Sequence, residues 1–140
     1  MIKNKALGKI GEDAASSYLS SSGYIIIEKN YSCKLGEIDI IAKKGRDLVF
    51  IEVKTRTNLS YGYPEESVSR YKIKKIKNVA KFFIINNNSF SDFNYRFDVI
   101  SIIIDKYMAD NIVCSDDINS DIKKIYSSNG SKFEHIKNAF

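Results

Sequence analysis

The sequence predicts an α/β fold in which a mixed central sheet is flanked by helices. Two observations carry this prediction. Apolar residues recur at helical spacing in two segments, and four other runs are rich in the Ile, Val and Phe typical of strands. The predicted order is α-β-β-β-α-β with a short final element, and no internal repeat is visible. A length of 140 residues suits a single domain spanning 1–140.

The first predicted helix covers residues 5–22 and ends at the Ser-rich stretch before Gly23. Its apolar positions lie at helical spacing: Leu7, Ile10, Ala14, Tyr18 and Leu19. Gly8 and Gly11 fall within the same apolar arc. Because glycine weakens a helix, we expect this arc to pack closely against the sheet as compensation.

Three predicted strands follow, at Tyr24–Glu28, Glu37–Ala42 and Leu48–Arg56. Lys44-Gly45 marks the turn of a hairpin between the last two.

The second predicted helix begins at Pro64, because proline suits a first helical turn. Its apolar stripe is Val68, Ile76, Val79 and Phe83, and it ends near residues 86–88. Tyr95–Ile104 is predicted as the next strand. Residues 107–131 are polar and acidic and are predicted as a surface excursion holding one short helix. The terminal sequence FEHIKNAF is apolar enough to dock back onto the body.

Several classes of protein are disfavoured by composition. The two cysteines, Cys33 and Cys114, form no C-x-x-C pair and indicate a reducing cytoplasm, where we expect the protein. A single histidine, His135, argues against a histidine-rich metal site or a histidine-based triad. No apolar run approaches the ~18 residues of a membrane span, and the N-terminus lacks the apolar core of a signal peptide.

The net charge of +5 and the pI near 9.1 favour a polyanionic partner. A solvated basic surface without such a partner is the plainer alternative, and charge alone does not decide between them.

The stretch GEIDIIAKKGRDLVFIEVKTR, residues 36–56, places charges inside two apolar strands. Side chains alternate across a strand, so Glu37 and Asp39 share one face, and Glu52 and Lys54 share one face. If the hairpin loop has an even number of residues, these faces coincide and Asp39 lies opposite Glu52 or one diagonal away. Two carboxylates that close repel unless a cation lies between them. Mg²⁺ or Mn²⁺, which prefer oxygen ligands, are the natural candidates.

Other groups are predicted to complete this site. Lys54 points the same way as Glu52, where it can orient a water molecule and offset charge on a phosphate. The Val53 backbone carbonyl is a further oxygen donor. Glu12 lies at the edge of the first helix's apolar arc, where that helix meets the sheet. Lys72 projects from the buried stripe of the second helix, unless it turns outward to solvent.

These residues resemble the PD-(D/E)xK nuclease superfamily, whose pattern is matched here by Asp39, Glu52 and Lys54 with an upstream helical Glu12. The order of elements is similar to archaeal Holliday junction resolvases, and more closely the chain looks like a member of the bacterial YraN-like family. The ordered matches are G-x-x-G-E at 8–12, Asn30-Tyr31, GEIDIIA at 36–42, VFIEVKTR at 49–56, Pro64 with Lys72, RFDVI at 96–100 and the terminal NAF. The triplet alone is weakly specific, whereas the ordered set is highly specific.

The resemblance implies a restriction-endonuclease-like αβββαβ core that hydrolyses phosphodiester bonds in DNA with a divalent metal. By position, Asp39, Glu52 and Glu12 would be metal ligands and Lys54 the catalytic lysine. Branched or structured DNA as substrate, and a homodimer, follow from the similarity to resolvases. The acidic excursion at 107–131 is longer than the family's usual connection, and branches of the superfamily bind nucleic acid without cleaving it.

DNA contacts are expected from Lys72, Lys75, Arg56 and Arg96. Each arginine could instead pair with a carboxylate such as Asp98. For the carboxylates themselves, the alternative is a structural ion-pair ladder across the hairpin. A nucleic-acid-binding module without cleavage, supporting recombination, repair or DNA uptake, is the second functional hypothesis.

Overall fold

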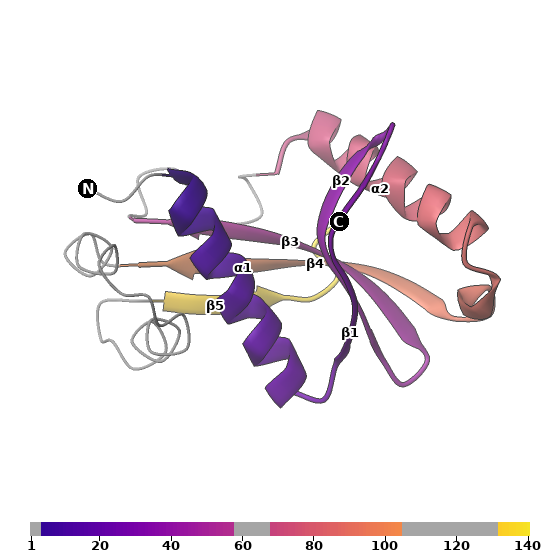
Figure 1. Ribbon diagram of the computed structural model, residues 1–140, viewed down its shortest axis with the longest axis horizontal. Coiled ribbons are helices and arrows are strands. Elements are labelled where there is room, and N and C mark those ends of the chain that lie inside the picture. Colours follow the sequence, from indigo (N-terminus) through magenta and orange to yellow (C-terminus); the bar gives the residue numbers. More distant parts are fainter. Residues whose placement is uncertain (1–3, 58–67, 105–131) are drawn as a thin grey trace.

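The computed structural model describes residues 4–57, 68–104 and 132–140. It has an α/β architecture with one five-stranded mixed sheet, as the sequence predicts (Figure 1). The helices are α1 (Asn4–Ser21), α2 (Arg70–Ile85) and the short 3₁₀ helix η2 (Asn88–Phe90). The strands are β1 (Ile25–Cys33), β2 (Gly36–Lys44), β3 (Asp47–Arg56), β4 (Asn94–Ile103) and β5 (Lys132–Ile136).

The strands lie in chain order across the sheet, from β1 to β5. β1, β2 and β3 form an antiparallel meander, β4 is parallel to β3, and β5 is antiparallel to β4. The β3–β4 connection therefore runs through α2, as a parallel pair requires. In the β2–β3 hairpin Lys44 pairs with Asp47, which leaves a two-residue loop. Gly45 has a φ of 60° in that loop, a conformation that glycine adopts without strain.

The helix α1 covers one face of the sheet (Figure 1). Leu7, Ala14 and Leu19 are buried against β-strand side chains, and Ile10 and Tyr18 are partly buried there. Gly11 is where the helix comes closest, because a Cβ at this position would lie 1.7 Å from Thr55 Oγ1. The expected close approach is thus confirmed at Gly11. It is wrong for Gly8, whose added Cβ would meet no described atom within 4 Å.

The helix α2 covers the opposite face, where Ile76, Val79 and Phe83 pack on residues of β2 and β3. Its beginning differs from the prediction. The helix starts at Arg70 and is capped by Ser69, whose hydroxyl accepts the Lys72 N–H at 3.2 Å. A serine cap satisfies a free N–H group of the first turn, so it sets the start here. Pro64 lies outside the described residues.

The strand β1 is longer than predicted, reaching Cys33 instead of Glu28. A bulge in its pairing near residues 26–28, together with Asn30 at a φ of 54°, interrupts the alternation that identifies a strand in sequence.

The chain end docks onto the body as predicted, and it does so as a fifth strand. β5 pairs with β4, and the Phe140 ring stacks on Phe97 at 5.5 Å between centroids. The predicted excursion at 107–131 lies outside the described residues. Within the described residues no helix has the length and apolar character needed to span a bilayer.

Gly11→Ala should destabilise the fold, because its methyl group would overlap the Thr55 side chain. Overpacking of this kind costs about 1–3 kcal/mol of unfolding free energy. Gly8→Ala is the matched control on the same helix. It should raise stability by about 0.5–1 kcal/mol, because alanine favours helix and the position is open. Urea unfolding followed by circular dichroism measures both, and equal midpoints for the two variants would contradict the close approach.

Candidate functional site

The two central carboxylates of the site meet where β2 and β3 separate. Backbone pairing between these strands ends at Ile40 and Ile51, so the next residues outward are Asp39 and Glu52, opposite each other. Instead of a strand partner, the Val53 N–H donates to the Asp39 carboxylate at 2.8 Å. The loop has two residues, so the condition of an even loop is met, and Asp39 and Glu52 lie together.

The Val53 carbonyl is directed toward the same gap as the Val53 N–H. This follows because both polar groups of one strand residue face the same neighbouring strand. An uncharged oxygen donor therefore accompanies the two carboxylates.

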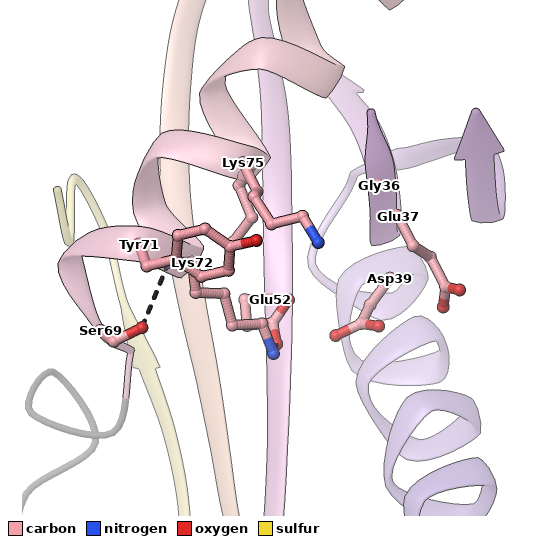
Figure 2. A pocket seen from close by; sticks show the side chains of 9 residues that line it. Gly36, Glu37, Asp39, Glu52, Ser69, Tyr71, Lys72 and Lys75 are labelled. Atoms are coloured by element: carbon pink, nitrogen blue, oxygen red, sulfur yellow. Dashed lines mark hydrogen bonds and ion pairs between the residues drawn. The ribbon is translucent and has the colours of Figure 1, made fainter. Parts of the chain in front are cut away.

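Glu52 is buried, with 5% of its surface exposed, although it carries an ionisable group. Two lysines compensate it. Lys72 Nζ lies 2.5 Å from Glu52 Oε1, and Lys54 Nζ lies 3.7 Å from the same oxygen. Figure 2 shows the Lys72 ammonium beside Glu52, with Asp39 facing them from β2. The structure thus turns Lys72 inward to the site.

Three carboxyl groups form a chain through Asp39. Asp39 is hydrogen-bonded to Glu52 on one side and to Glu12 on the other. Burial first, and the charge of Glu52 second, raise the pKa of Asp39 to about 8. Burial likewise raises the pKa of Glu12, and the nearby Glu37 charge adds to this against the hydrogen bond from Asn30. At neutral pH Asp39 therefore retains its proton, and among the described residues neither Asp39 nor Glu12 has an ammonium group within ion-pair distance.

The two lysines differ in their proton affinity. Burial, and then the neighbouring Lys72, lower the pKa of Lys54. Burial would also lower the pKa of Lys72, but its contact with Glu52 outweighs that effect and raises it. Since two ammonium groups share one carboxylate, Lys54 is the one that gives up its proton more readily.

A pocket of about 440 Å³ opens over Glu52 between α2 and the start of β2. It is lined by Gly36, Glu37, Asp39, Glu52, Ser69, Tyr71, Lys72, Lys75 and Ile76. Glu37 is exposed, which agrees with a solvated carboxylate at the open end of β2. A second hollow, lined by Glu12, Asn30 and Lys29 among others, lies on the other side of Glu37.

The predicted DNA-contacting residues separate into two groups. Lys72 and Lys75 line the pocket. The prediction that Arg96 contacts DNA at the pocket is corrected. Its guanidinium donates to Asp98 at 2.9 and 3.0 Å on the α1 face, away from the pocket, which is the alternative pairing considered from the sequence. Arg56 does not line the pocket either, and its buried guanidinium has no hydrogen-bond partner among the described residues.

Asp98, Arg96 and His135 form a structural network that sequence reasoning assigned only in part. His135 Nε2 lies 2.7 Å from Asp98 Oδ2, and its other ring nitrogen lies 3.1 Å from the Tyr18 hydroxyl. Burial alone would raise the pKa of Asp98, yet hydrogen bonds from His135 and Arg96 lower it. A fully buried carboxylate with these partners secures β5 to β4, which gives His135 a structural contact in the fold.

Two residues at the site were missed by sequence reasoning. Asn30 holds Glu12 from a left-handed backbone position, and Tyr71 stands exposed at the pocket mouth. In the sequence, Asn30-Tyr31 is visible only as one of the matches to the family pattern, and nothing there links Asn30 to Glu12. Tyr71 lies outside the apolar stripe of α2, and a single exposed aromatic residue forms no pattern in the sequence.

The oxygen donors of the pocket meet part of what a metal ion requires. Within the described part of the chain, no three His, Cys, Asp or Glu side chains stand in an arrangement that could hold one. Glu12 as a third direct ligand therefore does not match this arrangement. Mg²⁺, however, is usually bound by one or two carboxylates together with waters and substrate phosphates. Asp39, Glu52 and the Val53 carbonyl supply that smaller set, and their shortage of positive charge fits a cation.

The fold and the site define a class of α/β protein: a mixed sheet with helices on both faces and a carboxylate–lysine pocket at the open end of a hairpin. The chain belongs to UPF0102, an uncharacterised protein family whose model matches residues 11–102. A UPF0102 protein of Dictyoglomus turgidum is 48% identical over 103 residues, covering 74% of this chain and 86% of that protein. One from Clostridioides difficile is 50% identical over 103 residues, covering 74% and 90%. The family match includes every acidic and lysine residue of the pocket and ends before β5.

Asp39→Asn should change how stability depends on pH. The Asp39 pKa is about 8 in the folded chain and about 3.9 when unfolded, so the folded state holds the extra proton between these values. The free energy of unfolding therefore falls as pH rises through that window, by at most about 1.4 kcal/mol per pH unit. Asparagine keeps the acceptor for the Val53 N–H but cannot ionise, so the variant should lose most of this slope.

Urea unfolding at pH 5, 6, 7 and 8 measures the slope. Glu134→Gln, which removes an exposed carboxylate on β5, is the control and should behave like the original chain. A slope that survives unchanged in Asp39→Asn would show that Asp39 does not carry the proton.

Proposed function

We propose that this protein is a metal-dependent endonuclease of the PD-(D/E)xK type that hydrolyses phosphodiester bonds in branched or structured DNA. The observation that carries the proposal is the meeting of Asp39 and Glu52, from two separating strands, with Lys54 and Lys72 in one pocket. The D…ExK order and spacing of these residues support it, as does the basic net charge of +5. The proposed setting is the cytoplasm, and a homodimer is proposed from the similarity to resolvases.

In this proposal Asp39, Glu52 and the Val53 carbonyl hold Mg²⁺ or Mn²⁺. The ion supplies a Lewis acid that offsets negative charge on the phosphate. Glu12 orients Asp39 through their hydrogen bond, which is a supporting role in place of direct ligation. Lys72 and Lys75 attract the DNA backbone to the pocket.

Lys54 is assigned the proton transfer. A water molecule gives up a proton and adds through its oxygen to phosphorus, and one P–O ester bond breaks. The leaving oxygen takes a proton from solvent, so the products are a phosphate end and a hydroxyl end. Lys54 has a lowered pKa, so its amine can accept the proton that water releases at nearer-neutral pH than an ordinary lysine. Its position 3.7 Å from Glu52 keeps the amine beside the carboxylates.

A nucleic-acid-binding module without cleavage is the second candidate, supporting recombination, repair or DNA uptake. It is favoured by the close contact between Lys72 and Glu52, because an ammonium already compensates the most buried carboxylate of the pocket.

Cleavage assays separate the two candidates. Labelled single-stranded, duplex, flapped and four-way DNA are incubated with the protein and Mg²⁺ or Mn²⁺. Glu52→Gln and Lys54→Met should each reduce the cleavage rate by about 100-fold or more, because each removes charge placed at the reacting phosphate. Lys81→Met, which replaces an exposed lysine of α2 outside the pocket, should cleave normally. Cleavage that persists in both site variants would refute the assignment, and no cleavage of any substrate would favour the binding module.

Metal binding should depend on pH in a defined direction. Since the Asp39 pKa is about 8, a proton competes with the cation below that value. Mn²⁺ affinity, measured by calorimetry without DNA, should fall as pH is lowered from 8 to 6, by up to about tenfold per unit for one proton. Asp39→Asn should bind Mn²⁺ weakly with no such dependence. Affinity that stays constant with pH in the original chain would place the ion elsewhere.

A further inference from the structure

An aromatic side chain at the mouth of the pocket has no role in the chemistry above. Tyr71, in the first turn of α2, is 73% exposed, which is unusual for so large an apolar ring. It nevertheless lines the pocket beside Lys72 and Lys75. Figure 2 shows its ring next to the pocket, on the same wall as the two lysines and across from Asp39.

Helix geometry fixes this placement. Tyr71 and Lys75 are four residues apart, so they lie on one side of α2, and Lys75 Nζ lies 5.4 Å from the Tyr71 ring centroid. The neighbouring Lys72 reaches the buried Glu52. An aromatic surface and a cation therefore flank the entrance through which a phosphate must pass to reach the carboxylates.

The size of the pocket limits what can enter. A volume of about 440 Å³ is in the range of small-molecule sites and has room for a nucleotide. Glu52, one of the lining residues, is only 5% exposed. An unpaired or extruded base can offer its ring face to the exposed Tyr71, whereas both faces of a base stacked in a duplex are already covered.

We propose that Tyr71 is a specificity-determining residue that stacks on an unpaired base beside the phosphodiester held at Asp39 and Glu52. The substrate class is then DNA with an unpaired nucleotide at the reacting position, such as a single strand, a flap or an open branch point. Lys75 binds the adjacent backbone phosphate. This inference rests on the proposed function and narrows its substrate, because stacking accepts any base and rejects a paired one.

Binding without catalysis tests the inference. The full chain is mixed with single-stranded, flapped and fully paired DNA of one sequence, in EDTA at low salt, with 2-aminopurine at the unpaired position. The original chain should prefer single-stranded and flapped DNA and should quench 2-aminopurine fluorescence. Tyr71→Ala should weaken binding to these two DNAs by about 5- to 150-fold and abolish quenching, and Tyr71→Phe should retain both.

Phe82→Ala is the matched control, since Phe82 is an exposed aromatic residue of the same helix outside the pocket. It should bind and quench like the original chain. Because Tyr71 is exposed, its variants should keep the original unfolding midpoint.

The outcomes distinguish this inference from the proposed function. If Tyr71→Ala binds single-stranded and flapped DNA as well as the original chain, or if paired DNA binds equally tightly, stacking by Tyr71 is refuted. Cleavage that still depends on Glu52 would then leave the nuclease proposal standing. Tyr71-dependent quenching without cleavage of any DNA would support the stacking role of Tyr71. Only the proposal of hydrolysis would then be refuted.

Discussion

The site depends on the hydrogen bond from the Val53 N–H to the Asp39 carboxylate, which lies where β2 and β3 stop pairing. The two central strands stop pairing there, and a buried backbone N–H left without a partner would destabilise the fold. Using an aspartate as acceptor satisfies that N–H and fixes the carboxylate opposite Glu52. The same contact opens the edge of the hairpin, so the separation of the strands and the assembly of the site are one structural event.

That arrangement gathers more negative charge than the surroundings neutralise. Glu12, Asp39 and Glu52 form a connected set, and only Glu52 has ammonium groups within ion-pair distance among the described residues. The result is a pair of opposite pKa shifts: Asp39 and Glu12 hold protons more tightly, and Lys54 holds its proton less tightly. Groups shifted toward neutrality from both sides are characteristic of sites that bind cations and transfer protons.

The sheet separates the charges of the pocket from a second set of charges that stabilises the fold. On the α1 face, Asp98 is enclosed by Arg96, His135 and a backbone N–H from Asn138, so this buried charge is fully paired. That network ties the terminal strand to the sheet. On the α2 face, Lys72 and Lys75 stand at an open pocket whose rim carries an exposed aromatic ring. The Asp98 carboxylate is thus fully paired where it stabilises the fold, whereas the carboxylates of the pocket are incompletely compensated where a ligand has room to enter.

The sequence by itself determined the fold class, the two helices and the central hairpin, because these follow from local periodicity and from turn residues. That Asp39 and Glu52 face each other depended on the loop length, which the structure shows to be two residues. The sequence left the roles of Arg96 and Lys72 open. Each long side chain can reach several partners, and the sequence pattern does not show which of them is nearby. Tertiary structure sent Arg96 to Asp98 and Lys72 to Glu52. It also decided the start of α2 at Arg70, after the Ser69 cap, and it paired the chain end with β4 as a fifth strand. Contacts between segments far apart in sequence depend on which faces meet when the sheet is covered, and alternation along one segment carries no information about that.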